Sequence, residues 1–138
     1  MAAKGRVQNL VAIVTGAGSG IGQASAIRLA EEGATVVCAD RNSGSLEITK
    51  KLIADLNLHS ESYVIDISES KSCDELVTHT VNTYGSIDIL VNNAGVNLPG
   101  VFHEVSNETI DQTLDINVKG AMYLTRAAIP HMLKNNRG

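Results

Sequence analysis

One glycine-rich stretch sets the character of this chain. It reads Thr15-Gly16-Ala17-Gly18-Ser19-Gly20-Ile21-Gly22, and it joins an apolar run at residues 10–14 to a segment with helical periodicity at residues 23–32. Glycine tolerates positive φ and lets a ligand approach the backbone closely, while the first N–H groups of a helix and the helix dipole attract an anion. The stretch therefore predicts a binding site for the pyrophosphate of a dinucleotide.

The spacing of these glycines differs from two common phosphate-binding motifs. It follows T-G-x-x-x-G-x-G, whereas the strict G-x-G-x-x-G pattern fails whether it starts at Gly16 or at Gly18. No Lys-Ser/Thr pair follows the glycines, which disfavours the phosphate loop of a nucleotide triphosphatase. The alternative is a turn that merely joins a strand to a helix, and the later segments of the chain argue against it.

The composition is that of one globular domain without a nucleic-acid or membrane partner. The 138 residues are 43% hydrophobic and 19% charged, and the formal net charge is −4, so no basic stripe is available for nucleic acid or anionic lipid. Residues 1–6 lack the apolar core of a secretory signal, and no run approaches the roughly 18 apolar residues of a membrane span. We therefore expect a cytoplasmic protein.

The cysteines and histidines show no metal-binding pattern. Cys38 and Cys73 form no C-x-x-C motif, and Cys73 lies at helical spacing with Val77 and Val81. We interpret both cysteines as buried core thiols. The four histidines have no ligand spacing with one another or with the cysteines, so no metal site is expected.

Strands and helices are predicted to alternate along the chain. Apolar runs of strand length recur four times, at residues 10–15, 34–39, 62–67 and 87–91. The second helix is expected to bury a stripe of Ile48, Leu52 and Leu56, and the third a stripe from Cys73 to Tyr84. Because near-continuously apolar strands are typical of a parallel sheet with both faces covered, we predict a doubly wound α/β sheet of Rossmann type, truncated after about four strands.

Two further helices are expected at residues 106–117 and 118–135. The second is apolar on two sides, with Val118, Ala121, Met122, Thr125, Ile129 and Met132 along one stripe and Leu124, Ala127 and Ala128 on another. A helix of this kind is buried on both sides. We expect one side to pack on the sheet and the other, including Leu124, to form a homo-oligomer interface, and we expect Pro130 to kink this helix or end it early.

Asp40 follows the second strand about 20 residues after the glycine turn, where an adenosine ribose would lie. A carboxylate accepts hydrogen bonds from ribose hydroxyls but repels a 2′-phosphate by roughly a few kcal/mol at an effective dielectric near 20. Arg41 beside it would offset that repulsion, whereas Ser19 is neutral where a basic residue would help to hold a 2′-phosphate. We therefore expect NAD in preference to NADP, and the alternative is a solvated Asp40–Arg41 loop pair.

Polar residues also follow the third and fourth strands, as Asp66-Ile67 and Asn92-Asn93-Ala94-Gly95. Open α/β sheets bind ligands at the carboxyl ends of their strands. The aspartate is expected to accept a hydrogen bond from an adenine amino group, and the isoleucine to cover the ring. The second run offers a side-chain amide and bare backbone, which suit close approach to a ribose and ties between neighbouring strands. Simple strand-ending turns are the alternative.

Together these motifs resemble the NAD-preferring branch of the short-chain dehydrogenase/reductase family. The matching segments, in order, are Thr15 to Gly22, Asp40, Asp66-Ile67, Asn92 to Gly95 and Ile116-Asn117-Val118-Lys119-Gly120. The resemblance implies that the cofactor phosphates are held by Gly16, Ser19, Gly20, Ile21 and Gly22. It also implies that Asp40 holds the adenosine ribose, that Asp66 and Ile67 contact adenine, and that Asn93, Ala94 and Gly95 approach the ribose nearer the nicotinamide.

The resemblance is incomplete at the catalytic residues. Asn117 matches the family's asparagine that bends a helix and holds a water in the proton relay. The family also uses a serine and a Tyr-x-x-x-Lys pair, in which the tyrosine is the general acid/base. None of the three tyrosines here is followed by a lysine four residues later, and no serine occurs after Ser106. We therefore expect residues 1–138 to be the N-terminal, cofactor-binding part of a single Rossmann domain, either a fragment or the product of a shortened gene.

The resemblance implies hydride transfer between a nicotinamide and an alcohol or carbonyl substrate in the parent protein. One alternative is a catalytically silent module that binds a dinucleotide or pairs with full-length subunits. Another is a different Rossmann enzyme, such as an epimerase or a methyltransferase. The joint presence of Asn92-Asn93-Ala94-Gly95 and Asn117 weighs against this last reading.

Overall fold

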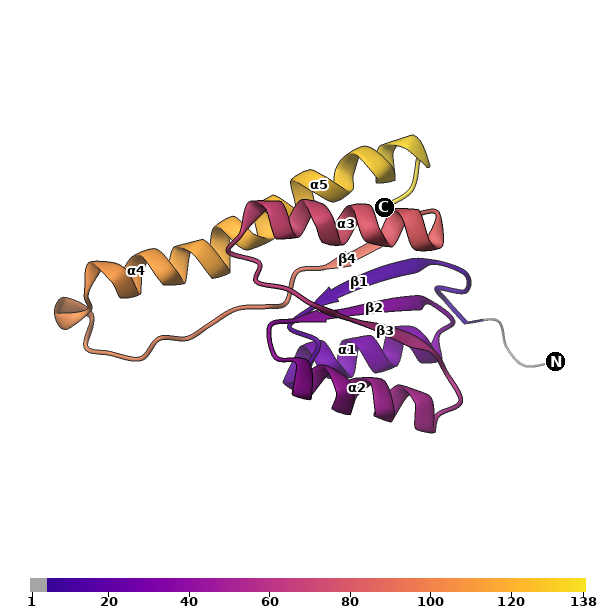
Figure 1. The fold of residues 1–138 in the computed structure, drawn as a ribbon, viewed down its shortest axis with the longest axis horizontal. Coiled ribbons are helices and arrows are strands. Elements are labelled where there is room, and N and C mark those ends of the chain that lie inside the picture. The colour runs from indigo at the N-terminus through magenta and orange to yellow at the C-terminus, as the bar shows by residue number, and fades with distance from the viewer. Residues whose placement is uncertain (1–4) are drawn as a thin grey trace.

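The computed structural model describes residues 5–138 and shows a parallel sheet with helices on both faces (Figure 1). The elements are β1 (Val11–Thr15), α1 (Gly20–Glu31), β2 (Thr35–Asp40), α2 (Ser43–Asp55), β3 (Ser60–Val64), α3 (Ser70–Tyr84), β4 (Ile89–Val91), η1 (Phe102–Glu104), α4 (Asn107–Leu114), η2 (Asp115–Gly120) and α5 (Ala121–Lys134). The segment at residues 1–6, for which no secretory signal is expected, falls mostly outside the described residues. Within the described range, no helix is both long enough and apolar enough to cross a bilayer.

The sheet has four parallel strands in the order β3-β2-β1-β4. The predicted α/β class is confirmed. β1 and β2 lie in the centre and are almost entirely buried, because helices cover both faces, whereas β4 is an edge strand and only half-buried. The third strand ends at Val64, and not at Ile67 as predicted, because Val64 is the partner of Asp40, the last residue of β2.

Two apolar cores lie on opposite faces of the sheet. α1 and α2 cover one face, and α3 and α5 cover the other (Figure 1). Because side chains alternate along a strand, Ile13 enters the α3–α5 core while its neighbour Val14 enters the α1–α2 core. Cys38 and Cys73 are fully buried, one in each core, so the interpretation of both as core thiols is confirmed.

The buried stripe predicted for α2 is wrong. Ile48, Leu52 and Leu56 are 59%, 40% and 46% exposed, whereas Leu46 and Ile53 are fully buried. The side that faces the sheet follows i, i+3, i+7 spacing from Leu46, and the predicted i, i+4, i+8 stripe lies on the adjacent side. Both spacings are helical, so periodicity alone does not say which one packs on the sheet. The stripe predicted for α3 is confirmed, since its members lie in or against the α3–α5 core.

The assignment of the two sides of α5 is also corrected. Leu124 and Ala128 are fully buried in the α3–α5 core, whereas Met122 is 63% exposed and Ile129 is also exposed. Leu124 therefore does not face a partner subunit as expected. The reason is the position of α3, which packs against α5 and takes this side of the helix into the core (Figure 1).

α4, η2 and α5 form one uninterrupted helical run from residue 107 to residue 134, and its α4 end projects beyond the sheet (Figure 1). The two helices predicted here are therefore continuous. A π-helical segment, η2, occupies the position of the predicted boundary. The run then continues through Pro130 to Lys134, so this proline does not end the helix early. Packing of Leu124 and Ala128 in the core offsets the hydrogen bond that a proline removes.

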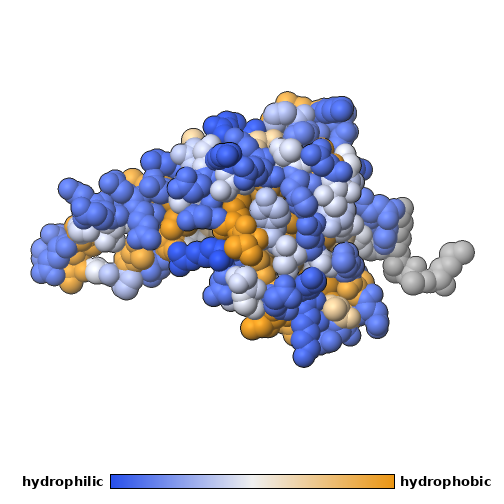
Figure 2. All heavy atoms as spheres, viewed as in Figure 1, coloured by the Kyte–Doolittle hydropathy of each residue, from blue (hydrophilic) through white to orange (hydrophobic). Residues whose placement is uncertain are grey.

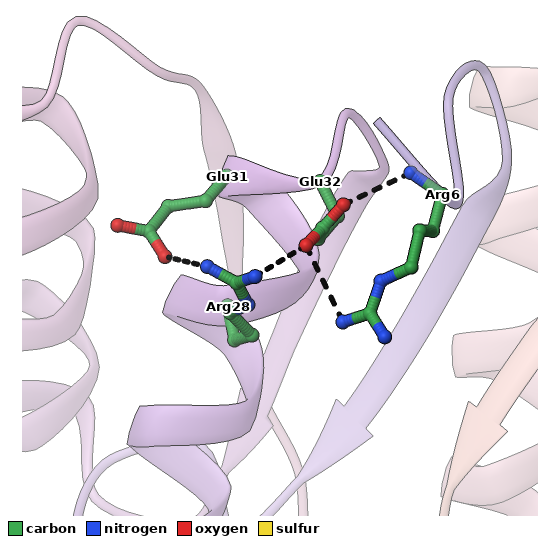
Figure 3. A network of polar contacts seen from close by, with 4 residues as sticks. All are labelled: Arg6, Arg28, Glu31 and Glu32. Atoms are coloured by element: carbon green, nitrogen blue, oxygen red, sulfur yellow. Dashed lines mark hydrogen bonds and ion pairs between the residues drawn. The ribbon is translucent and has the colours of Figure 1, made fainter. Parts of the chain in front are cut away.

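The segment before β1 is tied to the end of α1 by Glu32 (Figure 3). The Glu32 carboxylate accepts a hydrogen bond from the backbone N–H of Arg6, with 2.9 Å between nitrogen and Oε2, and forms ion pairs with the guanidinium groups of Arg6 and Arg28. Arg28 also pairs with Glu31 at 3.2 Å. The backbone hydrogen bond from Arg6, together with the two guanidinium groups, holds the pKa of Glu32 below its usual value despite desolvation.

Asp88 connects three distant parts of the chain at the start of the sheet. Its Oδ2 accepts hydrogen bonds from the Val11 N–H at 2.9 Å and the Ser86 hydroxyl at 3.0 Å, and its Oδ1 accepts from Arg137 Nε at 2.8 Å. Burial by itself would raise the pKa of Asp88, but the hydrogen bonds from Val11, Arg137 and Ser86 hold the pKa below its ordinary value. The carboxylate therefore stabilises the fold in its ionised form.

We expect the Asp88→Asn variant to lose part of the acid sensitivity of the fold. The folded-state pKa of Asp88 lies below the unfolded value. The contribution of this carboxylate to the free energy of unfolding is therefore complete above the unfolded pKa and is lost as the pH falls through the folded pKa. Urea unfolding between about pH 5 and pH 2 measures this, with Glu47→Gln, an exposed carboxylate on α2, as the control. An identical pH dependence in wild type and Asp88→Asn would contradict the prediction.

A pair of charge substitutions on α5 tests which of its sides is the core. Leu124→Asp should abolish folding, because an unpaired carboxylate in the α3–α5 core costs about 4 kcal/mol or more. Met122→Asp should change the free energy of unfolding by less than about 0.5 kcal/mol, because this side chain is exposed. Circular dichroism during urea unfolding distinguishes the two, and a folded Leu124→Asp variant would refute the assignment.

Candidate functional site

A cavity of about 390 Å³ lies at the carboxyl ends of the strands, where ligands bind in open α/β sheets. Its lining consists of Gly16, Ser19, Gly20, Ile21, Ala39, Asp40, Arg41, Ile65, Asp66, Ile67, Asn93, Ala94, Gly95, Val96 and Ile116. Figure 2 shows apolar surface gathered in the recess beside the projecting α4. The cavity thus brings together every residue predicted to bind the cofactor except Gly22.

Four residues that line the cavity were not predicted, namely Ala39, Ile65, Val96 and Ile116. All four are immediate sequence neighbours of a predicted site residue, and Ile65 also lies two positions before Ile67. The available signal was therefore proximity in sequence combined with period-2 alternation. All four contribute backbone or apolar side chain, which no search for polar chemistry would select.

The glycine-rich loop uses its glycines in different ways. Gly16 and Gly20 have φ of 65° and 54°, which side chains of L-residues rarely adopt. A Cβ on Gly20 would meet no atom within 4 Å, so this part of the loop faces open space in the cavity. A Cβ on Gly22 would lie 2.1 Å from the carbonyl oxygen of Gly16. Gly22 therefore lets α1 pack closely against the loop, which explains why it does not line the cavity.

α1 begins at Gly20, three residues before its predicted start. Ser19 is its N-cap residue and provides no side-chain cap. Within the described residues, the backbone N–H groups of Gly20, Ile21 and Gly22 have no acceptor, and the first bond of the helix runs from Gln23 N–H to Ser19 O. Three unpaired donors at the positive end of a helix dipole form an anion-binding site. The loop geometry therefore fits the phosphates of a dinucleotide.

Asp40 contacts the loop directly. Its Oδ2 accepts a hydrogen bond from the Gly18 N–H at 3.0 Å, and its Oδ1 accepts one from the Asn42 N–H, also at 3.0 Å. Each carboxylate oxygen keeps a lone pair for a ribose hydroxyl. The alternative of a solvated loop pair is therefore wrong for Asp40, whereas Arg41 is exposed at the rim of the same cavity.

Asp66 follows the end of β3 and presents one carboxylate oxygen for an additional donor. Its Oδ1 accepts hydrogen bonds from the hydroxyl of Ser68 at 2.7 Å and from the Ser68 N–H at 2.9 Å. These hydrogen bonds, helped by the positive charge of Arg41, lower the pKa of Asp66 despite some desolvation. Among the described residues no group donates to Oδ2. Ile67, buried beside it, supplies an apolar wall.

Thr15 and Asn93 join the carboxyl ends of β1 and β4. The buried Thr15 hydroxyl oxygen accepts hydrogen bonds from the N–H groups of Asn93 and Ala94 at 3.1 and 3.0 Å, and donates to Val91 O at 3.2 Å. Asn93 Nδ2 donates to Thr15 O at 3.0 Å. The predicted tie between neighbouring strands is confirmed. Thr15 itself was not predicted as a site residue, although a polar residue at the end of a buried strand was the signal.

Asn117 lies in η2 and holds the loop that follows β4. Its Oδ1 accepts a hydrogen bond from the Val96 N–H at 2.7 Å, and its Nδ2 donates to Val96 O at 2.8 Å. Asn117 does not line the cavity, but Val96 does. The helix irregularity expected at this asparagine is present as the π-helical segment, a feature often found at functional sites.

Comparison with known proteins assigns the family. Residues 10–138 match the model of the short chain dehydrogenase family. The chain belongs to this family. Within residues 5–138, no three His, Cys, Asp or Glu side chains are placed to share a metal ion.

Three proteins illustrate the similarity. A 3-oxoacyl-acyl-carrier-protein reductase of Thermotoga maritima is 34% identical over 133 residues, which are 96% of this chain and 54% of that protein. The structure of NAD+-bound xylitol dehydrogenase has a TM-score of 0.91 and 33% identity, covering 96% of this chain and 52% of that one. A metagenomic short-chain oxidoreductase in complex with NADP has a TM-score of 0.91 and 34% identity, covering 96% of this chain and 60% of that one.

The chain spans about half the length of the curated relatives it matches. One of these two solved structures holds NAD+, and the other holds NADP.

The Gly22→Ala variant should lose the geometry of the loop. A methyl group 2.1 Å from the Gly16 carbonyl oxygen forces the backbone to shift, at a cost of about 1–3 kcal/mol in unfolding free energy. The matched control is Gly44→Ala in the first turn of α2, where the added Cβ meets only an ordinary contact at 3.4 Å. Urea unfolding followed by circular dichroism should show destabilisation of the first variant alone, and equal stability of both would count against the packing role of Gly22.

Proposed function

We propose that residues 1–138 form the dinucleotide-binding part of a single Rossmann domain in an NAD-dependent oxidoreductase, with the residues of the proton-transfer step supplied from outside this stretch. The observation that carries the proposal is that one cavity is lined by Gly20 and Ile21 at the start of α1, whose N–H groups have no acceptor among the described residues, and by the carboxylates of Asp40 and Asp66. Phosphates, a ribose and an adenine ring call for these groups in this order.

Each part of the cofactor has proposed partners. The phosphates are assigned to Gly16, Ser19, Gly20, Ile21 and Gly22. The adenosine ribose is assigned to Asp40, the adenine ring to Asp66 and Ile67, and the ribose nearer the nicotinamide to Asn93, Ala94 and Gly95. When bound, the nicotinamide would supply or accept a hydride in the oxidation of an alcohol or the reduction of a carbonyl group.

Asn117 is proposed to hold a water of the proton relay in the whole enzyme. Each polar atom of its side chain makes one hydrogen bond to Val96 and keeps one hydrogen-bonding position. The side chain is exposed, so water reaches it. No Tyr-x-x-x-Lys pair occurs in the sequence, and residues 1–138 alone should therefore bind a dinucleotide without turning over an alcohol or a ketone.

Direct titration of NAD and NADP tests the proposed cofactor. We expect residues 1–138 to bind NAD at least about tenfold more tightly than NADP, equivalent to about 1.4 kcal/mol. The reason is that Asp40 repels a 2′-phosphate, and its hydrogen bond to Gly18 N–H keeps it in place. Asp40→Asn, which removes the charge and retains an acceptor, should reduce the preference to within about threefold.

Two calorimetric results would count against this account. Equal affinities of the wild-type chain for NAD and NADP would show that Arg41 compensates for Asp40. No binding of either dinucleotide would overturn the proposed site itself.

We also propose that the chain forms a homo-oligomer through the helix from Val118 to Met132. Val118, Met122 and Ile129 are exposed apolar side chains on one side of this helix, opposite the side that Leu124 buries in the core. An unpartnered apolar stripe of this kind suits a subunit interface. Sedimentation velocity should show the wild-type chain associating and the folded Met122→Asp variant associating more weakly, while a wild-type monomer at high micromolar concentration would refute the interface.

A further inference from the structure

Two side chains that do not line the cavity, those of Thr49 and Gln23, form hydrogen bonds to the backbone of the glycine-rich loop. The Thr49 hydroxyl of α2 donates to the carbonyl oxygen of Ala17 at 2.8 Å. Gln23 Nε2 of α1 donates to the carbonyl oxygen of Gly18 at 3.3 Å and to Thr49 Oγ1 at 2.9 Å. These three contacts form a chain from Gln23 through Thr49 to the loop.

The end of β2 holds the N–H groups of the same two loop residues, Ala17 and Gly18. Ala17 N–H donates to Ala39 O at 3.1 Å, and Gly18 N–H donates to Asp40 Oδ2 at 3.0 Å. The N–H and the C=O of Ala17 and Gly18 are therefore all engaged. Because these residues lead directly into the N-terminus of α1, their orientation sets the direction of the unpaired N–H groups of Gly20, Ile21 and Gly22.

The geometry distinguishes Thr49 from an ordinary threonine in a helix. A helical threonine commonly donates to the carbonyl four residues earlier, and for Thr49 that contact, to Ser45 O, is 3.3 Å long. The contact to Ala17 O is shorter at 2.8 Å, and a hydroxyl has one proton to donate. Thr49 is fully buried, so the Ala17 carbonyl would have no water to replace this donor.

We propose that Thr49 and Gln23 are positioning residues for dinucleotide binding, which fix the Ala17–Gly18 backbone so that the N–H groups at the start of α1 converge on the cofactor pyrophosphate. The inference rests on the dinucleotide site proposed above. It assigns a contribution to affinity to two side chains that would not touch the ligand. It also explains the polar residue at the sheet-facing position of α2 that lies between the buried Leu46 and Ile53.

The test compares the NAD affinity of residues 1–138 carrying Thr49→Val, Thr49→Ser or Gln23→Met by calorimetry. Thr49→Val keeps the shape of the side chain but removes the hydroxyl, and it should raise the Kd for NAD about tenfold. Thr49→Ser restores the hydroxyl and should return the Kd to within about threefold of wild type. Gln23→Met should weaken binding in the same direction, and the double variant should be weakened by less than the product of the two single effects, because both act through one chain of hydrogen bonds.

Thr80→Val on α3 is the matched control. Thr80 is also fully buried, but its hydroxyl donates within its own helix to Leu76 O at 2.9 Å. The control should lower the unfolding midpoint without changing the Kd for NAD in the folded fraction. An unchanged Kd in both folded Thr49→Val and Gln23→Met, with NAD binding intact in wild type, would overturn the positioning role alone. Absence of NAD and NADP binding in wild type would instead overturn the proposed function.

Discussion

The hydrogen bonds that hold the loop between β1 and α1 are the constraint on which the site depends. Glycine gives this loop its shape but also leaves it free to adopt others, so neighbouring elements must restrict it. β2 does so through Ala39 and Asp40, and the segment after β4 does so through Asn93, whose Nδ2 donates to the carbonyl oxygens of Thr15 and Gly16. The loop is therefore rigid only in the assembled sheet, and the anion-binding geometry at the start of α1 is a property of the whole fold.

Asp40 links two parts of the proposed cofactor site that are usually considered separately. The carboxylate would meet the adenosine ribose, and it already holds the Gly18 N–H of the phosphate loop. A change at this position therefore acts on both regions at once. Selectivity for the adenosine half and affinity for the pyrophosphate are therefore coupled through one hydrogen bond. Only an isosteric substitution would remove the charge of Asp40 and keep its hydrogen-bond acceptor.

Carboxylates outside the cavity have a different task. Glu32 and Asp88 tie the segment before β1 and the segment after α5 to the body of the fold, and both are held ionised by donors from distant residues.

Opposite the core, the exposed side of α5 carries apolar residues that none of the described elements covers. The family relatives are about twice as long as this chain, and their activities concern the whole proteins.

The sequence by itself determined the class of the fold and most of the residues that surround the cavity. Apolar strand-like runs and a glycine turn are local patterns, and parallel topology then carries every strand end to one edge of the sheet. Only the tertiary structure decided which sides of α2 and α5 are buried, because Leu46 and Leu52, or Leu124 and Met122, satisfy helical periodicity equally well until a neighbouring element packs against one of them. The same reason hid Thr49 and Gln23. Thr49 donates to the carbonyl of Ala17, 32 residues earlier in the chain, and accepts a hydrogen bond from Gln23, 26 residues earlier. No sequence spacing encodes this proximity.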